Sequence, residues 1–293
     1  MSRILALDVG GTYIKSAVAD FSDGEPRLGP VQRTSTLVGD GDALVAQLAG
    51  VAATHGDFDR VGVVTPGILD EAKGVIKYAT NLKLADFDLA PRLADRVGRP
   101  VRLAHDGRAA ALAELRLGAG RGFDNFVLMP IGTGISVGIV VDGRVLSSEG
   151  QAGEIGHADV GHDEVCGCGL RGCLEVFSST SGIERRYLQA AGRAAGADEV
   201  LALASSGDAV AARIWLDATD AIALACDWLM NTLSPQSIAF AGGLSKAGST
   251  LTDAVGAKLS TRVSFQRTPR LGIAELGDDA GCLGAALTGW ELP

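Results

Sequence analysis

The chain has 293 residues, of which 47% are hydrophobic and 21% charged, and its formal net charge is −9. This composition excludes a disordered protein, and the length favours two lobes over a single domain. An acidic chain without a Lys/Arg cluster repels a phosphate backbone, so we expect no nucleic-acid partner. No apolar run is long enough for a signal peptide or a membrane span, so we expect a cytoplasmic protein with no membrane partner.

A glycine turn follows the first apolar segment. Residues 4–9 and 14–19 are both strand-like, which predicts a β-hairpin around the sequence DVGGTYIK. The backbone N–H groups of such a turn can approach a phosphate, and a carboxylate beside it can orient hydrated Mg²⁺. A plain glycine turn is the alternative interpretation. The candidate nucleotide-binding residues here are Asp8, Gly10, Gly11, Thr12 and Lys15.

Asp106 occupies the point where a strand passes into a helix. Helical spacing at residues 42–55 and a strand at 60–65 come first, then a short strand at 100–104 and a helix that Asp106 caps and Gly118 stops. In α/β proteins this edge of a sheet binds ligands. A carboxylate there can act as the base for transfer to an alcohol, and a helix-capping role can coexist with that one.

The second half repeats the pattern of strand, Gly/Thr turn and strand at residues 125–146. Its turn, Gly132-Thr133-Gly134, can bind the outer phosphates of the same nucleotide. After a long helix at 208–233 and a strand at 237–241, Gly242-Gly243 suits an adenine or a ribose, whereas Gly281 and Gly284 suit tight helix packing equally well. We expect lobes at residues 1–118 and 119–277, with a C-terminal helix at 278–293 packing back on the first.

Three of the five cysteines, Cys166, Cys168 and Cys173, lie on one glycine-rich loop, and His157 precedes them by nine positions. These four ligands fit a tetrahedral zinc site, with His162 as a competitor for the fourth place. Four protein ligands leave no open position, so the zinc would be structural. A disulfide with one spare thiol is the alternative, which a cytoplasmic location disfavours. Cys226 and Cys282 are expected in the core.

The sequences AGEIGH (152–157) and CGCGLRGCLE (166–175), supported by DVGGTYIK, resemble the ROK (repressor, open reading frame, kinase) family of bacterial sugar kinases, including its glucokinases. The likeness runs from Leu5 to about Ala286. It implies a duplicated α/β actin-like ATPase (ribonuclease H-like) fold with two lobes around a cleft. It also implies transfer of phosphate from ATP to a hexose or N-acetylhexosamine, often at the 6-hydroxyl, and a homodimer.

The resemblance also assigns roles to residues. Asp106 would be the catalytic base, and the sugar hydroxyls would be held by Asn81, Glu154, His157 and Glu175. His157 would serve both the sugar and the zinc, so that zinc would position the loop that carries the sugar ligands. The implied cofactors are ATP, Mg²⁺ and a structural Zn²⁺.

Two residues depart from the family pattern. His105 replaces the Asn that contacts the sugar in most relatives, and Arg108 replaces a second Asn. The His105 side chain either contacts an unusual acceptor, such as a polyol or cyclitol, or points away from the substrate into the hinge. The Arg108 side chain either faces a phosphate or an acidic group of the substrate, or lies on the solvated surface. Polyphosphate as donor and a non-catalytic sugar-binding regulator are the remaining alternatives; we disfavour the regulator because no DNA-binding segment precedes the first strand.

Overall fold

The computed structural model describes residues 2–22 and 24–291, so the last two residues of the predicted C-terminal helix lie outside the described part. The chain forms two compact units. The first comprises Met1–Arg116, Leu146–Ala152 and Asp278–Pro293, and the second comprises Leu117–Val145 and Gly153–Gly277. The segment Leu146–Ala152 therefore packs with the first unit, although the sequence analysis placed it in the second lobe.

The first unit is built on a sheet of order β3-β2-β1-β5-β9. The predicted hairpin is confirmed, because β1 (Arg3–Val9) and β2 (Tyr13–Asp20) are antiparallel neighbours. The strands β5 (Arg60–Thr65) and β9 (Val101–His105) continue the sheet parallel to β1. Their carboxyl ends therefore meet at one edge. The outer strands β3 (Arg27–Leu28) and β4 (Gln32–Ser35) both pair with β2.

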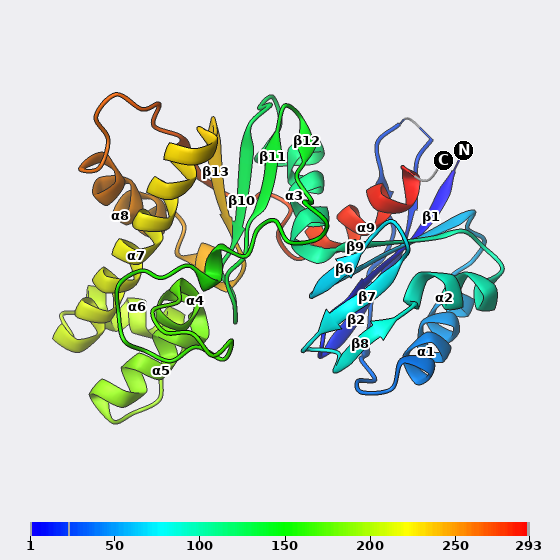
Figure 1. Ribbon diagram of the computed structural model, residues 1–293, viewed down its shortest axis with the longest axis horizontal. Coiled ribbons are helices and arrows are strands. Elements are labelled where there is room, and N and C mark those ends of the chain that lie inside the picture. The colour runs from blue at the N-terminus through cyan, green and yellow to red at the C-terminus, as the bar shows by residue number, and fades with distance from the viewer. Residues whose placement is uncertain (1, 23, 292–293) are drawn as a thin grey trace. The chain divides into compact units, whose positions relative to one another are not determined.

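Helices α1 (Gly41–Thr54) and α2 (Leu89–Val97) lie side by side along one face of this sheet (Figure 1). The first begins after Asp40, whose carboxylate accepts the Ala43 N–H at 3.0 Å and so caps the helix. Because side chains alternate along a strand, every second residue of β1 enters the core beneath these helices. Core residues of this cluster include Leu5, Leu7, Leu44, Leu48 and Leu93.

Helix α9 (Ala280–Trp290) packs on β1 and β5, against the residues that alternate with that core. A Cβ at Gly62 of β5 would lie 1.8 Å from the carbonyl oxygen of Ala285, so the helix touches the bare strand backbone. At Gly284, a Cβ would come within 2.5 Å of the Ala109 backbone. The predicted close packing of this small-residue helix is thus confirmed.

A second, three-stranded sheet in the first unit was not predicted. It has the order β6-β7-β8 and consists of β6 (Ile68–Asp70), β7 (Val75–Ala79) and β8 (Leu84–Phe87). The helix α3 (Asp106–Leu117) follows β9 directly, and Asp106 is its first helical residue rather than a separate cap.

The second unit repeats the strand arrangement of the first. Its sheet has the order β12-β11-β10-β13-β14, in which the central strand β10 (Phe126–Pro130) pairs antiparallel with β11 (Gly138–Val141) and parallel with β13 (Ser237–Ala241). The edge strands are β12 (Arg144–Val145) and β14 (Arg270–Ile273). This matches the order and direction of β2, β1, β5 and β9, which confirms the predicted duplication of architecture.

Helix α7 (Ala209–Leu233) is the longest element of the second unit, and Asp208 caps it by accepting the Ala211 N–H at 2.9 Å. It packs against α4 (Leu174–Ser178), α5 (Thr180–Ala191), α6 (Ala197–Ser205) and α8 (Ser249–Ser260).

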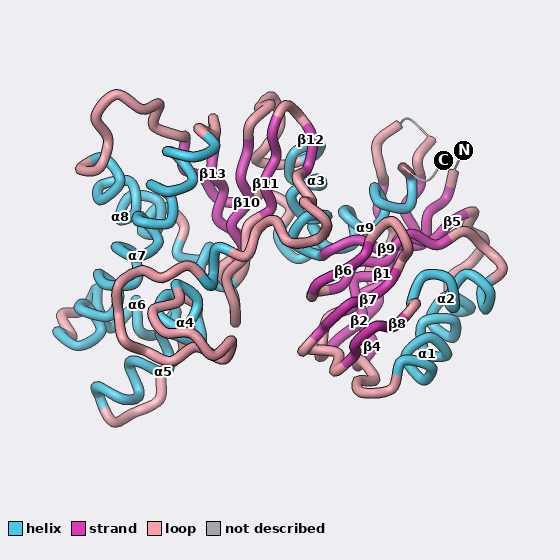
Figure 2. Tube along the Cα trace, viewed as in Figure 1, coloured by secondary structure: helices cyan, strands magenta, loops and turns pink. Residues whose placement is uncertain are grey.

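Short 3₁₀ turns lie at η1 (Ile155–His157), η2 (Gly243–Ala247) and η3 (Gly277–Asp279). Most of the chain from β12 to α4 is loop (Figure 2). No helix among the described residues is long and apolar enough to cross a membrane.

The contact between β5 and α9 yields a stability prediction. Gly62→Ala should lower the free energy of unfolding by about 3 kcal/mol, because the added methyl group has only backbone to displace. Gly50→Ala is the matched control: a Cβ there meets nothing within 4 Å, and alanine in a helix should raise stability by about 0.5–1 kcal/mol. Urea unfolding of both variants checks this, and equal stability of the two would contradict the packing.

Candidate functional site

In the first unit, the predicted acidic residues meet at the carboxyl edge of the sheet. Asp8 lies one residue before the end of β1, Thr65 ends β5, and Thr65 pairs in register with His105 at the end of β9. Asp106 follows at once. The parallel pairing therefore brings Asp8 and Asp106 together, although they are far apart in sequence, at the edge where α/β proteins bind ligands.

The ionised form of the Asp8 side chain is destabilised by burial. Burial, with a smaller contribution from the Asp106 charge, raises its pKa from 3.8 to about 6, against the opposing effect of Lys15. The Lys15 Nζ lies 3.8 Å from the Asp8 Oδ2, directly across the hairpin, and donates to the carbonyl oxygen of Asp278 at 3.0 Å. Because Lys15 does not fully offset the burial of the Asp8 charge, this carboxylate is a good ligand for a further cation.

Helix α9 begins against this carboxylate. A Cβ at Gly281 would lie 2.3 Å from the Asp8 Oδ2, so any larger residue would displace the acid. For Gly281, as for Gly284, the close-packing interpretation is therefore the one that the structure supports.

The glycine turn after β1 is held in place from two sides. Thr36 donates its hydroxyl to the Gly10 carbonyl at 2.7 Å and its N–H to the Thr12 carbonyl at 2.9 Å. On the other side, a Cβ at Gly11 would lie 2.8 Å from the carbonyl oxygen of Asn81. Asn81, expected at the sugar, thus lies against the turn expected at the phosphates, and both Thr12 and Asn81 are exposed.

Asp106 presents a carboxylate that is 41% exposed. Its Oδ1 accepts the Gly107 N–H at 2.6 Å, which orients the group at the start of α3. The His105 ring is buried beside it, with Nδ1 3.4 Å from that oxygen and 3.2 Å from the same Gly107 nitrogen. This geometry suits a positioned base with an imidazole at its side.

Arg108 is buried, so both of the interpretations of its side chain offered by the sequence are corrected. It is 3% exposed and forms an ion pair with Glu71, from the turn between β6 and β7, at 2.9 Å between Nη2 and Oε1. The anionic partner is thus a residue of the protein. Glu71 had no signal of its own in the sequence, because its partner lies 37 positions away.

In the second unit, two glycine turns meet at the carboxyl ends of the parallel strands β10 and β13. The Leu244 N–H donates to the Ile131 carbonyl at 3.0 Å, and the Ile131 N–H donates to the Ala241 carbonyl at 2.9 Å. Gly242 has φ +76°, and a Cβ there would lie 2.6 Å from the Ile131 oxygen. The predicted turns Gly132-Thr133-Gly134 and Gly242-Gly243 therefore form one continuous glycine-lined edge.

Glu175 lies against the first of these turns. Its Oε2 accepts the Ile135 N–H at 2.9 Å, and a Cβ at Gly134 would lie 2.5 Å from that oxygen. The segment with Glu154 and His157 runs along the same turn, since a Cβ at Gly156 would meet the Ile135 carbonyl at 2.1 Å. Glu154 is exposed and does not cap the short η1 helix that it precedes.

The predicted metal ligands come together. One ligand atom from each of His157, Cys166, Cys168 and Cys173 lies within 4.8 Å of all the others. The Cys168 and Cys173 sulfurs are 3.7 Å apart, and the Cys166 sulfur is 3.8 Å from the His157 Nδ1. A tetrahedron with about 2.3 Å from metal to sulfur has edges of about 3.8 Å, so the donor set fits such an ion.

His162 is not a ligand in this arrangement. Its Nε2 donates to the Cys173 carbonyl at 3.2 Å, its Nδ1 accepts the Glu164 N–H at 3.1 Å, and its ring stacks on Phe177. Both ring nitrogens are therefore in use. All five cysteines are free, so the disulfide alternative is wrong, and Cys226 and Cys282 are buried as expected.

The ROK family profile matches residues 4–289. A glucokinase from Halalkalibacterium halodurans is 32% identical, over 98% of this chain and 93% of that protein. The crystal structure of a ROK hexokinase from Thermus thermophilus is 34% identical, with TM-score 0.87 and 98% of each chain covered. A ROK glucokinase from Streptomyces griseus, in complex with glucose and AMPPNP, is 25% identical, with TM-score 0.85 over 99% of this chain and 100% of that one.

The raised pKa of Asp8 predicts a stability that falls with pH. The folded state holds a proton on Asp8 up to about pH 6, whereas the unfolded chain loses it near 3.8, so this group destabilises the fold as pH rises between these values. Asp8→Asn cannot ionise. The stability of Asp8→Asn relative to wild type should therefore be about 2.4 kcal/mol more favourable at pH 8 than at pH 4, because the unfolded chain is already partly ionised at pH 4.

Urea unfolding at the two pH values measures this difference. The control is Asp95→Asn, an exposed position on α2, whose effect should change by less than about 0.5 kcal/mol between the two values. An Asp8→Asn effect that is independent of pH would show that Asp8 ionises normally.

Proposed function

This chain belongs to the ROK family, and we propose that it is an ATP-dependent kinase that phosphorylates a hydroxyl of a hexose or N-acetylhexosamine, preferentially the 6-hydroxyl. The observation that carries the proposal is the exposed carboxylate of Asp106, fixed at the carboxyl edge of the sheet. The similarity to a glucokinase and to a glucokinase structure with glucose and AMPPNP supports the substrate class. The family also confirms the predicted actin-like ATPase (ribonuclease H-like) fold.

Asp106 acts as the general base in this proposal. It accepts the proton of the sugar hydroxyl while that oxygen attacks the γ-phosphorus in line, and the bond to the leaving ADP oxygen breaks. The bond from the Gly107 N–H holds one carboxylate oxygen, so the group needs no reorientation before it acts.

Hydrogen-bonding side chains would fix the rest of the sugar. Carboxylates accept from hydroxyls, whereas Asn and neutral His both donate and accept, so together they can discriminate between epimers. The residues proposed for this role are Asn81, His105, Glu154, His157 and Glu175.

The nucleotide phosphates would be bound by the two glycine turns. In the first unit these are Gly10, Gly11 and Thr12, with Lys15 and Asp8 beside them; in the second unit they are Gly132, Thr133 and Gly134, with Gly242-Gly243 for the adenosine. Asp8 would hold Mg²⁺, which supplies neutralisation of phosphate charge. The high pKa of Asp8 supports this role, because a bound cation relieves the cost of its ionisation.

The four-ligand cluster would hold a structural zinc ion. Three thiols and one imidazole at tetrahedral spacing are the donor set that zinc prefers, and no fifth ligand is needed. Zinc there would fix the loop between His157 and Cys173, and with it Glu154 and Glu175.

The remaining parts of the proposal concern location and assembly. Five free cysteines are typical of a reducing compartment, and ATP is available there, so we place the protein in the cytoplasm. We also propose a homodimer, on the family resemblance.

Asp106→Asn should reduce turnover by about 10³-fold and leave the melting temperature unchanged, because a half-exposed group loses only its charge. The measurement is coupled ADP release from ATP with a panel of hexoses, N-acetylhexosamines and cyclitols. Asp95→Asn is the matched control and should keep full activity. Near-normal turnover in Asp106→Asn would remove Asp106 as the base, and no ADP release by wild type with any acceptor would refute the kinase.

Metal analysis should find about one zinc per chain. Cys168→Ser should lose it and lower the melting temperature by about 5 °C or more, with a raised KM for the sugar, since a structural zinc site contributes folding energy. His162→Gln is the control, because that ring lies outside the cluster. Equal zinc content in wild type and Cys168→Ser would contradict the site.

A further inference from the structure

A buried ion pair at the start of α3 has no place in the mechanism above. Arg108 has 4% of its side chain exposed and Glu71 has 27%. One carboxylate oxygen, the Glu71 Oε1, accepts from the Arg108 Nη2 at 2.9 Å and from its Nε at 3.2 Å. Two bonds from one guanidinium to one oxygen fix the Arg108 side chain against the turn between β6 and β7.

The same oxygen also holds the residue before the base. The His105 N–H donates to the Glu71 Oε1 at 2.9 Å. Glu71 therefore binds the chain on both sides of Asp106, through the backbone of His105 and the side chain of Arg108. Asp106 has no direct contact with Glu71 in this arrangement, so any effect of Glu71 on the base passes through these neighbours.

Arg108 reaches a third segment with its remaining nitrogen. The Nη1 donates to the carbonyl oxygens of Gly150 and Ala152, at 3.3 and 3.4 Å. Both belong to the segment Leu146–Ala152, which packs with the first unit while the chain on either side belongs to the second. Ala152 is followed by Gly153 and Glu154, so Arg108 fixes the place where the chain that carries Glu154 leaves the first unit.

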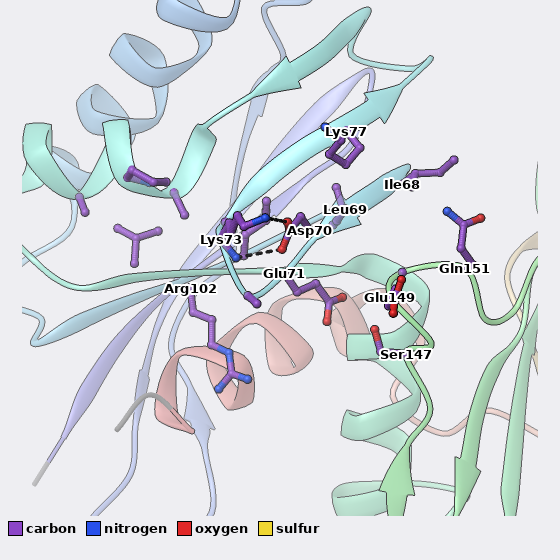
Figure 3. Close-up of a pocket in the computed structure, with 18 residues that line it drawn as sticks. Ile68, Leu69, Asp70, Glu71, Lys73, Lys77, Arg102, Ser147, Glu149 and Gln151 are labelled. Carbon is purple, nitrogen blue, oxygen red and sulfur yellow. Dashed lines mark hydrogen bonds and ion pairs between the residues drawn. The ribbon is translucent and has the colours of Figure 1, made fainter.

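Few other contacts near Glu71 and Arg108 could replace these hydrogen bonds. A cavity of about 1070 Å³ lies between the β6–β7 turn and the segment 147–151, and the Glu71 carboxylate points toward that segment (Figure 3). Lys73, the nearest cation along the turn, is bonded to Asp70 at 3.0 Å (Figure 3). Because the cavity limits side-chain packing here, polar contacts hold the segment, together with the close approach of Gly150 to the Leu69 backbone.

We propose that Glu71 and Arg108 are positioning residues that form a latch: they hold the strand end before Asp106 and the segment that leads to Glu154 in one fixed arrangement. This inference rests on the proposed function for its kinetic consequence. The latch itself is a structural statement that can be tested without activity.

Hydrogen exchange of the apo protein tests the latch. Glu71→Gln keeps the size of the side chain and removes its charge, so the amides of residues 104–107 and 148–152 should exchange about 10-fold faster, both together. Lys73→Met, in the same turn, removes only the exposed pair with Asp70 and should leave both segments unchanged. Faster exchange confined to residues 70–74 would overturn the latch.

Steady-state kinetics test its role. In Glu71→Gln the KM for the sugar should rise about 10-fold and kcat should fall, while the KM for ATP stays within about twofold, because the base and the sugar ligand lose their fixed positions. Arg108→Lys should behave in the same way, since one ammonium cannot make both contacts. Arg108→Lys also provides the test if Glu71→Gln does not fold.

The control is Asp217→Asn, a half-buried acid of the second unit whose side chain is 27% exposed, like that of Glu71, and which pairs with Arg186 and Arg213. It should lower the melting temperature and leave both KM values unchanged. If Glu71→Gln shows that same pattern, the pair is merely structural and its role in positioning is refuted. If wild type releases no ADP with any sugar, the proposed function fails, and the exchange data still decide whether the latch exists.

Discussion

The parallel pairing of β1 with β5 and of β10 with β13 is the constraint on which both halves of the site depend. In each sheet a hairpin strand and its parallel neighbour end at the same edge, so their following loops are brought together whatever their separation in sequence. In the first sheet β9 continues the parallel pairing beyond β5, so Asp106, directly after β9, lies at the same edge as Asp8. In the second sheet the same constraint brings Gly132 to Gly242. The duplicated strand order provides two such edges in one chain.

Close backbone contacts make these edges possible, and they limit which residues can stand there. Gly281 leaves room for the Asp8 carboxylate, Gly11 for the Asn81 backbone and Gly134 for Glu175. Each glycine brings a backbone against an acidic or polar group that would otherwise be solvated. At Asp8 this contact disfavours the ionised carboxylate, because burial raises its pKa to about 6. A bound cation would stabilise the ionised form.

Elements defined by residues close together in the sequence could be predicted. Contacts between residues far apart in the sequence could not. The two hairpins, the strand before Asp106 and the cysteine loop each depend on residues close in sequence, and the structure contains all of them. The sheet β6-β7-β8 was missed because its strands are short and β7 lacks alternation, with two exposed residues in succession. The place of Arg108 depends on Glu71, which no periodicity or spacing connects to it.

The replacement of the family's Asn by Arg108 therefore also involves Glu71, its partner in the ion pair. A cation in the first turn of a helix opposes the helix dipole, and burying it without a partner would cost several kcal/mol more. Glu71 offsets both costs, and the carbonyls of Gly150 and Ala152 accept from the Arg108 Nη1. An amide at this position would need no acid opposite it, so Arg108 and Glu71 are expected to change together. Their effect on the acceptor would be indirect, through where the His105 backbone and the segment before Glu154 are held.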